Sequence, residues 1–145
     1  MAKVVLRFVT TRSLFSWIVR QACWSKFSHV EFALADGYLG AQGIGGVQLR
    51  PFDYEKNPIE TFRYVNVTDK EYDAIMRYAR AQIGKPYDWS GIFGIATHRD
   101  WHRANSWFCS ELVAACFDFA NHPLIKDKVD RVTPEMLFEL PEVRQ

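Results

Sequence analysis

Cys109 is the residue of this sequence whose type and position best suit covalent chemistry. It opens the apolar segment 109–117, and Ser106 or Asn105 just upstream is a suitable helix cap, so we expect Cys109 in the first turn of a helix. There, unpaired backbone N–H groups and the positive end of the helix dipole favour a thiolate over a thiol. A thiolate is the nucleophilic form, so the position suits nucleophilic catalysis.

A cysteine nucleophile needs a base, and His29 is the best candidate in the chain. Residues 29–35 have the pattern of a β-strand, in which alternate side chains share a face, so Glu31 is expected beside His29. A carboxylate there orients the imidazole and stabilises its charged form. Gln42, on the expected partner strand, is the alternative, because an amide also orients a ring nitrogen by hydrogen bonding. The choice between Glu31 and Gln42 stays open, with a narrow preference for Glu31.

Each of these residues also has an ordinary structural interpretation. A cysteine in an apolar helix is usually a small core residue, and Cys116 lies seven positions further along the same stripe. Cys116 and Cys23 are predicted core residues. A strand histidine such as His29 often only bonds a neighbour, and Glu31 alone suits a solvated or ion-paired sheet position. Spacing does not show that nucleophile, base and orienting group meet.

Two other patterns indicate no cofactor chemistry. His98 and His102 are four residues apart, but no cysteine or carboxylate shares their face, so we expect no metal site and no cofactor. The basic run around them is expected to be an exposed loop. Residues 43–46 are rich in glycine but lack the strand and helix context of a phosphate-binding loop, so they are predicted to form a hairpin loop or a cleft edge.

The elements that must position these residues are predicted from periodicity and caps. Helices are expected at 13–24, from a Thr68 cap to about Ile83 with Glu71 completing a capping box, around Cys109 in its first turn, and after Thr133. Strands are expected at 4–10, 29–35, 38–42, 47–51 and 60–67, with a turn at 36–37. This order predicts one α+β domain over residues 1–145, an antiparallel sheet packed against helices.

Composition narrows the class of protein. The chain has 145 residues, 48% of them hydrophobic, enough for one domain with a sizeable core. A net charge of +1 indicates neither a nucleic-acid partner nor an acidic membrane. The three cysteines contain no CxxC pair, so neither a disulfide framework nor a cysteine-rich zinc site is expected.

The first residues suggest where the protein resides. Residues 1–9 contain no long apolar run, so we expect no signal peptide, no transmembrane helix and a cytoplasmic location. A phage-encoded protein, or one exported by another route, would look the same. The oligomeric state is not indicated by the sequence.

Three motifs together resemble a known family. They are Ser28-His29-Val30-Glu31-Phe32, Gly84-Lys85-Pro86-Tyr87-Asp88 and Phe108-Cys109-Ser110-Glu111-Leu112-Val113, followed by an ending at 133–137. They resemble the circularly permuted papain-like branch of the NlpC superfamily, which includes YiiX-like and YaeF-like hydrolases and, more distantly, lecithin retinol acyltransferase. Here the histidine precedes the cysteine, as in the permuted order. The family often has a small residue where Glu31 stands, and its third polar group usually comes from the next strand, near Gln42.

The resemblance implies a fold and an activity. The fold is papain-like, with the Cys109 nucleophile at a helix N-terminus packed on an antiparallel sheet and His29 as base. Tyr87 of the Pro-Tyr motif would contact the substrate or assist the oxyanion, with the Cys109 N–H as the other donor. The implied activity is hydrolysis of a peptide or acyl-amide bond, for example in a cell-wall peptide, through an acyl-enzyme.

Two competing functions share the same residues. One is acyl transfer or lipid-ester hydrolysis, with Phe93, Trp101 and Trp107 lining an acyl pocket. The other is a papain-like binding module without catalysis, which the joint presence of nucleophile, base and polar third residue disfavours.

Overall fold

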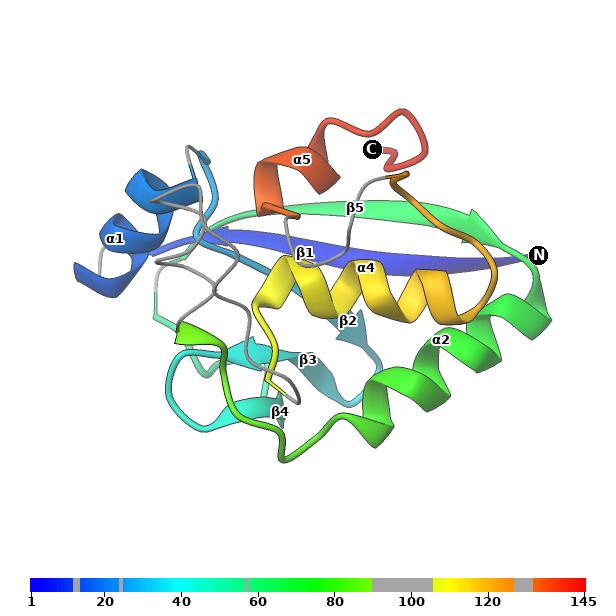
Figure 1. Ribbon diagram of the computed structural model, residues 1–145, viewed down its shortest axis with the longest axis horizontal. Helices are drawn as coiled ribbons and strands as arrows, with labels where there is room; N and C mark the ends of the chain where they lie inside the picture. The colour runs from blue at the N-terminus through cyan, green and yellow to red at the C-terminus, as the bar shows by residue number, and fades with distance from the viewer. Residues whose placement is uncertain (12–13, 24, 57, 90–105, 127–131) are drawn as a thin grey trace.

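The structure is a computed structural model of residues 1–145, and it describes all of them except 12–13, 24, 57, 90–105 and 127–131 (Figure 1). The predicted exposed loop around His98 and His102, and the aromatic residues Phe93 and Trp101, therefore lie outside the described residues.

Five antiparallel strands form the sheet. They are β1 (Ala2–Thr10), β2 (His29–Leu34), β3 (Gly37–Gln42), β4 (Gly46–Arg50) and β5 (Ile59–Val67), in the order β4-β3-β2-β1-β5. Each predicted strand is present within one or two residues of its expected bounds. The central strand is thus β2, and the predicted base His29 is its first residue.

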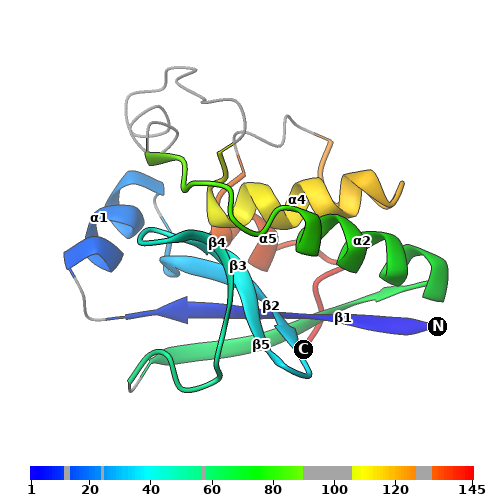
Figure 2. The same cartoon turned by 90° about the horizontal axis from the view of Figure 1, so that it is seen from below.

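The described helices are α1 (Leu14–Cys23), α2 (Asp69–Ala81), α4 (Cys109–Phe119) and α5 (Pro134–Phe138). Figure 2 shows α2 and α4 side by side over one face of the sheet, where α4 contacts β2 and β3. The arrangement is an α+β fold with an antiparallel sheet packed against helices, as predicted. No helix in the described part of the chain is long and apolar enough to cross a membrane.

Strand alternation separates an apolar face from a polar one. Phe8 pairs with Val30, and both are fully buried members of the apolar core. The next pair along the ladder is Arg7 and Glu31, whose side chains bond each other instead of joining that core. The period of two residues therefore brings charged groups together in the middle of an otherwise apolar sheet.

Local sequence explains where α2 begins. The Thr68 hydroxyl accepts a hydrogen bond from the Glu71 N–H (3.2 Å), and the Glu71 carboxylate accepts one from the Thr68 N–H (2.7 Å). This is the predicted capping box, which satisfies donors that a helix start leaves unpaired. At the other end of the chain, Thr133 caps α5 with Pro134 in its first turn, also as predicted.

The predicted cap of α4 is wrong. The helix does begin at Cys109, but its N-cap residue is Phe108, which makes no side-chain cap hydrogen bond. Ser106 lies one residue before Trp107, which pairs in a β-bridge with Tyr87, so its hydroxyl is too far upstream to cap the helix. Asn105 lies outside the described residues. The extended pairing of Trp107 thus delays the helix start until Cys109.

Candidate functional site

Cys109 is the first residue of α4 and is fully buried. The N-cap residue of α4, Phe108, makes no side-chain cap hydrogen bond, and the positive end of the helix dipole lies at Cys109. The Cys109 side chain lies close enough to His29 to raise the pKa of the imidazole, whose side chain is 14% exposed. The predicted nucleophile and base, 80 positions apart, are therefore brought together by the packing of α4 on β2.

The start of α4 is held by the segment that carries Tyr87. The Trp107 N–H donates to the Pro86 carbonyl (3.0 Å), and the Asp88 N–H donates to the Trp107 carbonyl (3.0 Å). Tyr87 is buried, with its ring 5.9 Å from that of Phe108. The Pro-Tyr motif is thus fixed beside the residue that precedes Cys109.

A glycine lets this segment approach the sheet. Gly46 begins β4 with a φ of +70°, and a Cβ there would lie 2.2 Å from the Lys85 carbonyl oxygen. That same oxygen accepts a hydrogen bond from the Val47 N–H (2.8 Å). The glycine-rich stretch 43–46 is therefore a hairpin loop, as predicted, and its last glycine docks the segment that leads to Tyr87.

His29, Glu31 and Gln42 form a triangle of close polar contacts. His29 Nε2 lies 2.9 Å from Glu31 Oε2, and Gln42 Nε2 lies 3.1 Å from both of those atoms. A carboxylate only accepts, whereas an amide nitrogen only donates. Both contacts of Glu31 Oε2 are satisfied when the His29 Nε2–H and the Gln42 N–H both donate to it. In that arrangement Glu31 orients the ring, and Gln42 orients Glu31.

The second oxygen of Glu31 is held by two residues that the sequence analysis missed. Arg7 Nη1 donates to Glu31 Oε1 (2.7 Å), and the Tyr54 hydroxyl donates to the same oxygen (3.0 Å). Glu31 is 0% exposed. Together with the contacts of His29 and Gln42, its two oxygens accept from four donors, which is about the full capacity of a carboxylate. Arg7 had a signal in the sequence, a lone charge between Leu6 and Phe8 in an apolar strand. Tyr54 had none.

The charges in this cluster shift one another's protonation. Burial alone would lower the pKa of His29, but the charge of Glu31 and hydrogen bonds to Cys109 and Glu31 raise it to about 10. Burial alone would raise the pKa of Glu31, but the charge of His29 and the bonds from His29 and Arg7 lower it. At neutral pH the His29 ring is therefore an imidazolium held by an ionised carboxylate.

A second glycine makes room for the triangle. A Cβ on Gly40 of β3 would lie 2.8 Å from the Glu31 Cβ and 3.4 Å from His29 Nε2. Real Cβ atoms do not come within 3.0 Å of such a neighbour, so any side chain at this position displaces the carboxylate or the ring.

The remaining predicted residues lie apart from this group or outside the described residues. Cys116 is buried, and burial raises the pKa of its thiol, which suits the predicted core role. Trp107 is half-buried, and its indole N–H donates to Gln82 Oε1 (3.2 Å). The side chain of Cys23 lies outside the described residues.

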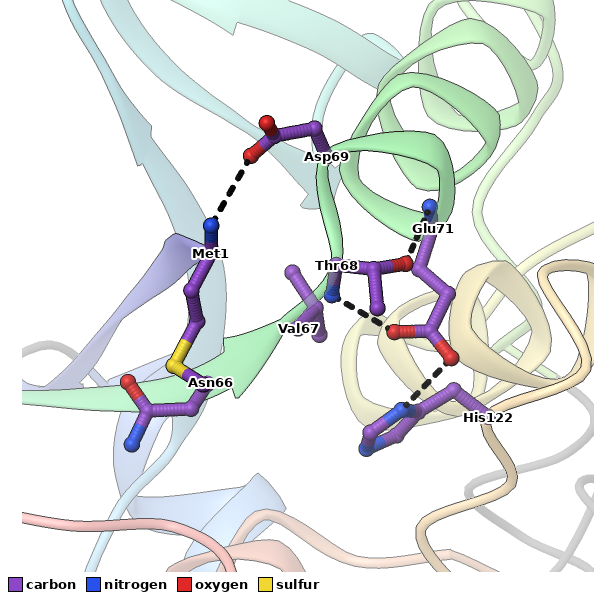
Figure 3. A pocket seen from close by; sticks show the side chains of 7 residues that line it. All are labelled: Met1, Asn66, Val67, Thr68, Asp69, Glu71 and His122. Carbon is purple, nitrogen blue, oxygen red and sulfur yellow. Dashed lines mark hydrogen bonds and ion pairs between the residues drawn. The ribbon is translucent and has the colours of Figure 1, made fainter.

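A surface cavity of about 640 Å³ lies elsewhere, at the N-terminal end of α2 (Figure 3). Its charged groups pair with one another, Glu71 with His122 at 3.3 Å and the N-terminal amine with Asp69 at 3.5 Å. Figure 3 shows these pairs at its wall, which is lined by Met1, Asn66, Val67, Thr68, Asp69, Glu71 and His122. None of these residues belongs to the group around Cys109, so this cavity is separate from the candidate site.

The fold has a counterpart among solved structures. The chain is similar to the metalloprotein YiiX of Escherichia coli O157:H7, with a TM-score of 0.65 and 16% identity over 97% of this chain and 93% of that one. At this identity the likeness shows a shared fold alone. No family model matches the sequence, and no curated protein matches it.

Proposed function

We propose that this protein is a cysteine hydrolase of the permuted papain-like type, which cleaves an amide bond through an acyl-enzyme. The observation that carries the proposal is the placement of Glu31, hydrogen-bonded to His29 at 2.9 Å, with that imidazole beside Cys109 at the start of α4. The fold shared with YiiX agrees with the family that the motifs resemble. The order along the chain, base before nucleophile, is the permuted one.

The residues divide the reaction between them. The Cys109 sulfur attacks the carbonyl carbon, and the imidazolium of His29 gives its proton to the amine as the C–N bond breaks. The neutral imidazole then takes a proton from water while the oxygen attacks the thioester, and the C–S bond breaks to return the thiolate. Glu31 keeps the ring oriented throughout and stays ionised.

The oxyanion is stabilised by donors near the start of α4. The Cys109 N–H is one, because a helix N-terminus presents unpaired N–H groups. Tyr87 is the proposed second contact, on the support of its fixed position beside Phe108. A carboxylate such as Glu31, saturated by four donors, is unsuited to act as the nucleophile itself.

YiiX is described as a metalloprotein, so we tested whether the residues here suit a metal. In the described ranges no three His, Cys, Asp or Glu side chains gather as metal ligands. Both oxygens of Glu31 already accept from donors, and the Arg7 cation lies 2.7 Å from one of them. This donor set does not fit a cation, so no step is assigned to a metal.

No specific observation favours the acyltransferase alternative. Of the three aromatic residues expected to line an acyl pocket, Trp107 bonds Gln82, and Phe93 and Trp101 lie outside the described residues. The non-catalytic alternative is disfavoured because a binding module has no need for an imidazolium held between a buried carboxylate and a thiol.

The test is hydrolysis of muropeptides and of simple chromogenic amides by the wild type and by Cys109→Ala. We expect activity in the wild type and its loss in Cys109→Ala. Cys116→Ala is the matched control, since it removes a buried thiol from the same helix without touching His29, and its activity should persist. Activity unchanged in Cys109→Ala would sink the mechanism.

A further inference from the structure

We propose that Arg7 and Tyr54 are positioning residues of the proposed active site, which act on its base through Glu31. The inference rests on the function proposed above for the site around Cys109. It concerns two residues that contact neither the base nor the thiol in any described hydrogen bond.

Arg7 is immobilised on several sides. It lies opposite Glu31 in the β1–β2 ladder and is 2% exposed. Its Nη1 donates to Glu31, its Nε donates to Glu60 on β5, and its guanidinium carbon stands 4.2 Å from the centre of the Tyr38 ring. A planar guanidinium that is bonded through both Nε and Nη1 cannot turn, so it fixes the position of Glu31 Oε1.

Tyr54 reaches the same oxygen from the connection between β4 and β5. Its hydroxyl donates to Glu31 Oε1 at 3.0 Å, and its ring stands 5.2 Å from the Arg50 guanidinium carbon. Burial and the charge of Glu31 raise the pKa of Tyr54, which keeps the hydroxyl protonated and able to donate.

The two oxygens of Glu31 thus have separate partners. Oε1 faces Arg7 and Tyr54, whereas Oε2 faces His29 and Gln42. Because the carboxylate is planar and rigid, fixing Oε1 also fixes where Oε2 meets the imidazole. Releasing Oε1 lets the Glu31 side chain rotate, and the ring then loses its alignment with the thiol. A loss of alignment by about 1 Å is enough to slow a reaction by about 100-fold.

The experiment measures how fast iodoacetamide alkylates Cys109 in the full chain at pH 7, followed by peptide mapping. The variants are Arg7→Lys, which keeps the charge but loses the fork, and Tyr54→Phe, which loses one hydroxyl. Each is made alone and together with Glu31→Gln. Tyr64→Phe is the matched control, because Tyr64 lies on β5 with its ring near Lys3, away from this group.

We expect Arg7→Lys to slow alkylation by about 10- to 100-fold and Tyr54→Phe by about threefold to tenfold. Tyr64→Phe should match the wild type. In the Glu31→Gln background both effects should shrink to less than about twofold, since residues that act through Glu31 have nothing left to act on. Tyr54→Phe carries the test if Arg7→Lys does not fold.

The outcomes separate this inference from the proposed function. The positioning role is overturned if the alkylation rate of Cys109 falls equally in the wild-type and Glu31→Gln backgrounds, or does not fall at all. This holds even if Cys109→Ala abolishes hydrolysis. Coupling through Glu31 without any hydrolysis supports the positioning role and leaves the proposed amide cleavage refuted.

Discussion

Glu31→Gln is the perturbation that tests the buried network most severely. The side chain keeps its shape but loses its charge. Its new NH2 group must face either Arg7 and Tyr54 or His29 and Gln42, all of which donate to Glu31 in the wild type. One buried pair of donors is then left without an acceptor. The imidazolium of His29 also loses the charge that raises its pKa most, so burial makes the neutral ring the favoured form.

The size of the effect follows from the pKa of His29. A tenfold change in proton affinity is worth about 1.4 kcal/mol, so the rise from 6.5 to about 10 corresponds to about 5 kcal/mol, of which Cys109 supplies part. Breaking one partner out of a buried ion pair costs about 3–5 kcal/mol. We therefore expect Glu31→Gln to lower the free energy of unfolding at pH 7 by about 3–5 kcal/mol, or the Tm by about 10–15 °C for a chain of this length.

The assay is thermal and urea unfolding followed by circular dichroism from pH 6 to pH 10. Because the folded pKa of His29 is raised, its contribution in the wild type is complete below about pH 6.5 and is lost as the pH rises through about 10. The gap between wild type and variant should therefore narrow toward pH 10. Glu142→Gln, at an exposed position, is the control and should leave stability unchanged. A loss below about 1 kcal/mol at pH 7, or a gap independent of pH, would refute this account of Glu31.

Other predictions separate the geometry of the site from the stability of the fold. Gly40→Ala places a Cβ 2.8 Å from that of Glu31, so we expect amide hydrolysis to fall by at least about tenfold in steady-state assays. Gly84→Ala, with no atom within 4 Å but a φ of +97°, should cost stability and leave kcat unchanged; an equal loss of kcat in both variants would contradict the steric argument. Thr68→Ala removes the capping box and should lower the free energy of unfolding by about 1 kcal/mol with full activity retained, measured by urea titration. A drop in the activity of Thr68→Ala under native conditions would contradict this, because it would show that the start of α2 affects the geometry of the site.

The sequence predicted most of the fold because its signals are local. The capping box at Thr68, the alternation from His29 to Leu34 and the proline in the first turn of α5 each determine an element without help from distant residues. Cys109 was predicted in the first turn of α4, where it lies, but the cap residue was predicted wrongly. The pairing of Trp107 with Tyr87 keeps the chain extended up to the N-cap Phe108, and this contact between distant segments is not encoded by any local pattern.

The candidate site was predictable only in part. Alternation placed His29 and Glu31 on one face, and their side chains meet there at 2.9 Å, with His29 beside Cys109. The open choice between Glu31 and Gln42 needed atomic distances, because either residue type orients an imidazole. Tyr54 was beyond prediction, since a loop tyrosine meets the carboxylate only after β4 and β5 have paired with their neighbours.

The measurement that tests the central claim most directly is the site of reaction with an acylating electrophilic probe. After brief exposure of the full chain, digestion and mass spectrometry identify which cysteine carries the acyl group. We predict the adduct on Cys109, little on Cys116 or Cys23, and a loss of the adduct in His29→Gln. Equal labelling of the three cysteines, or labelling of Cys109 that is unchanged in His29→Gln, would contradict a nucleophile activated by its histidine.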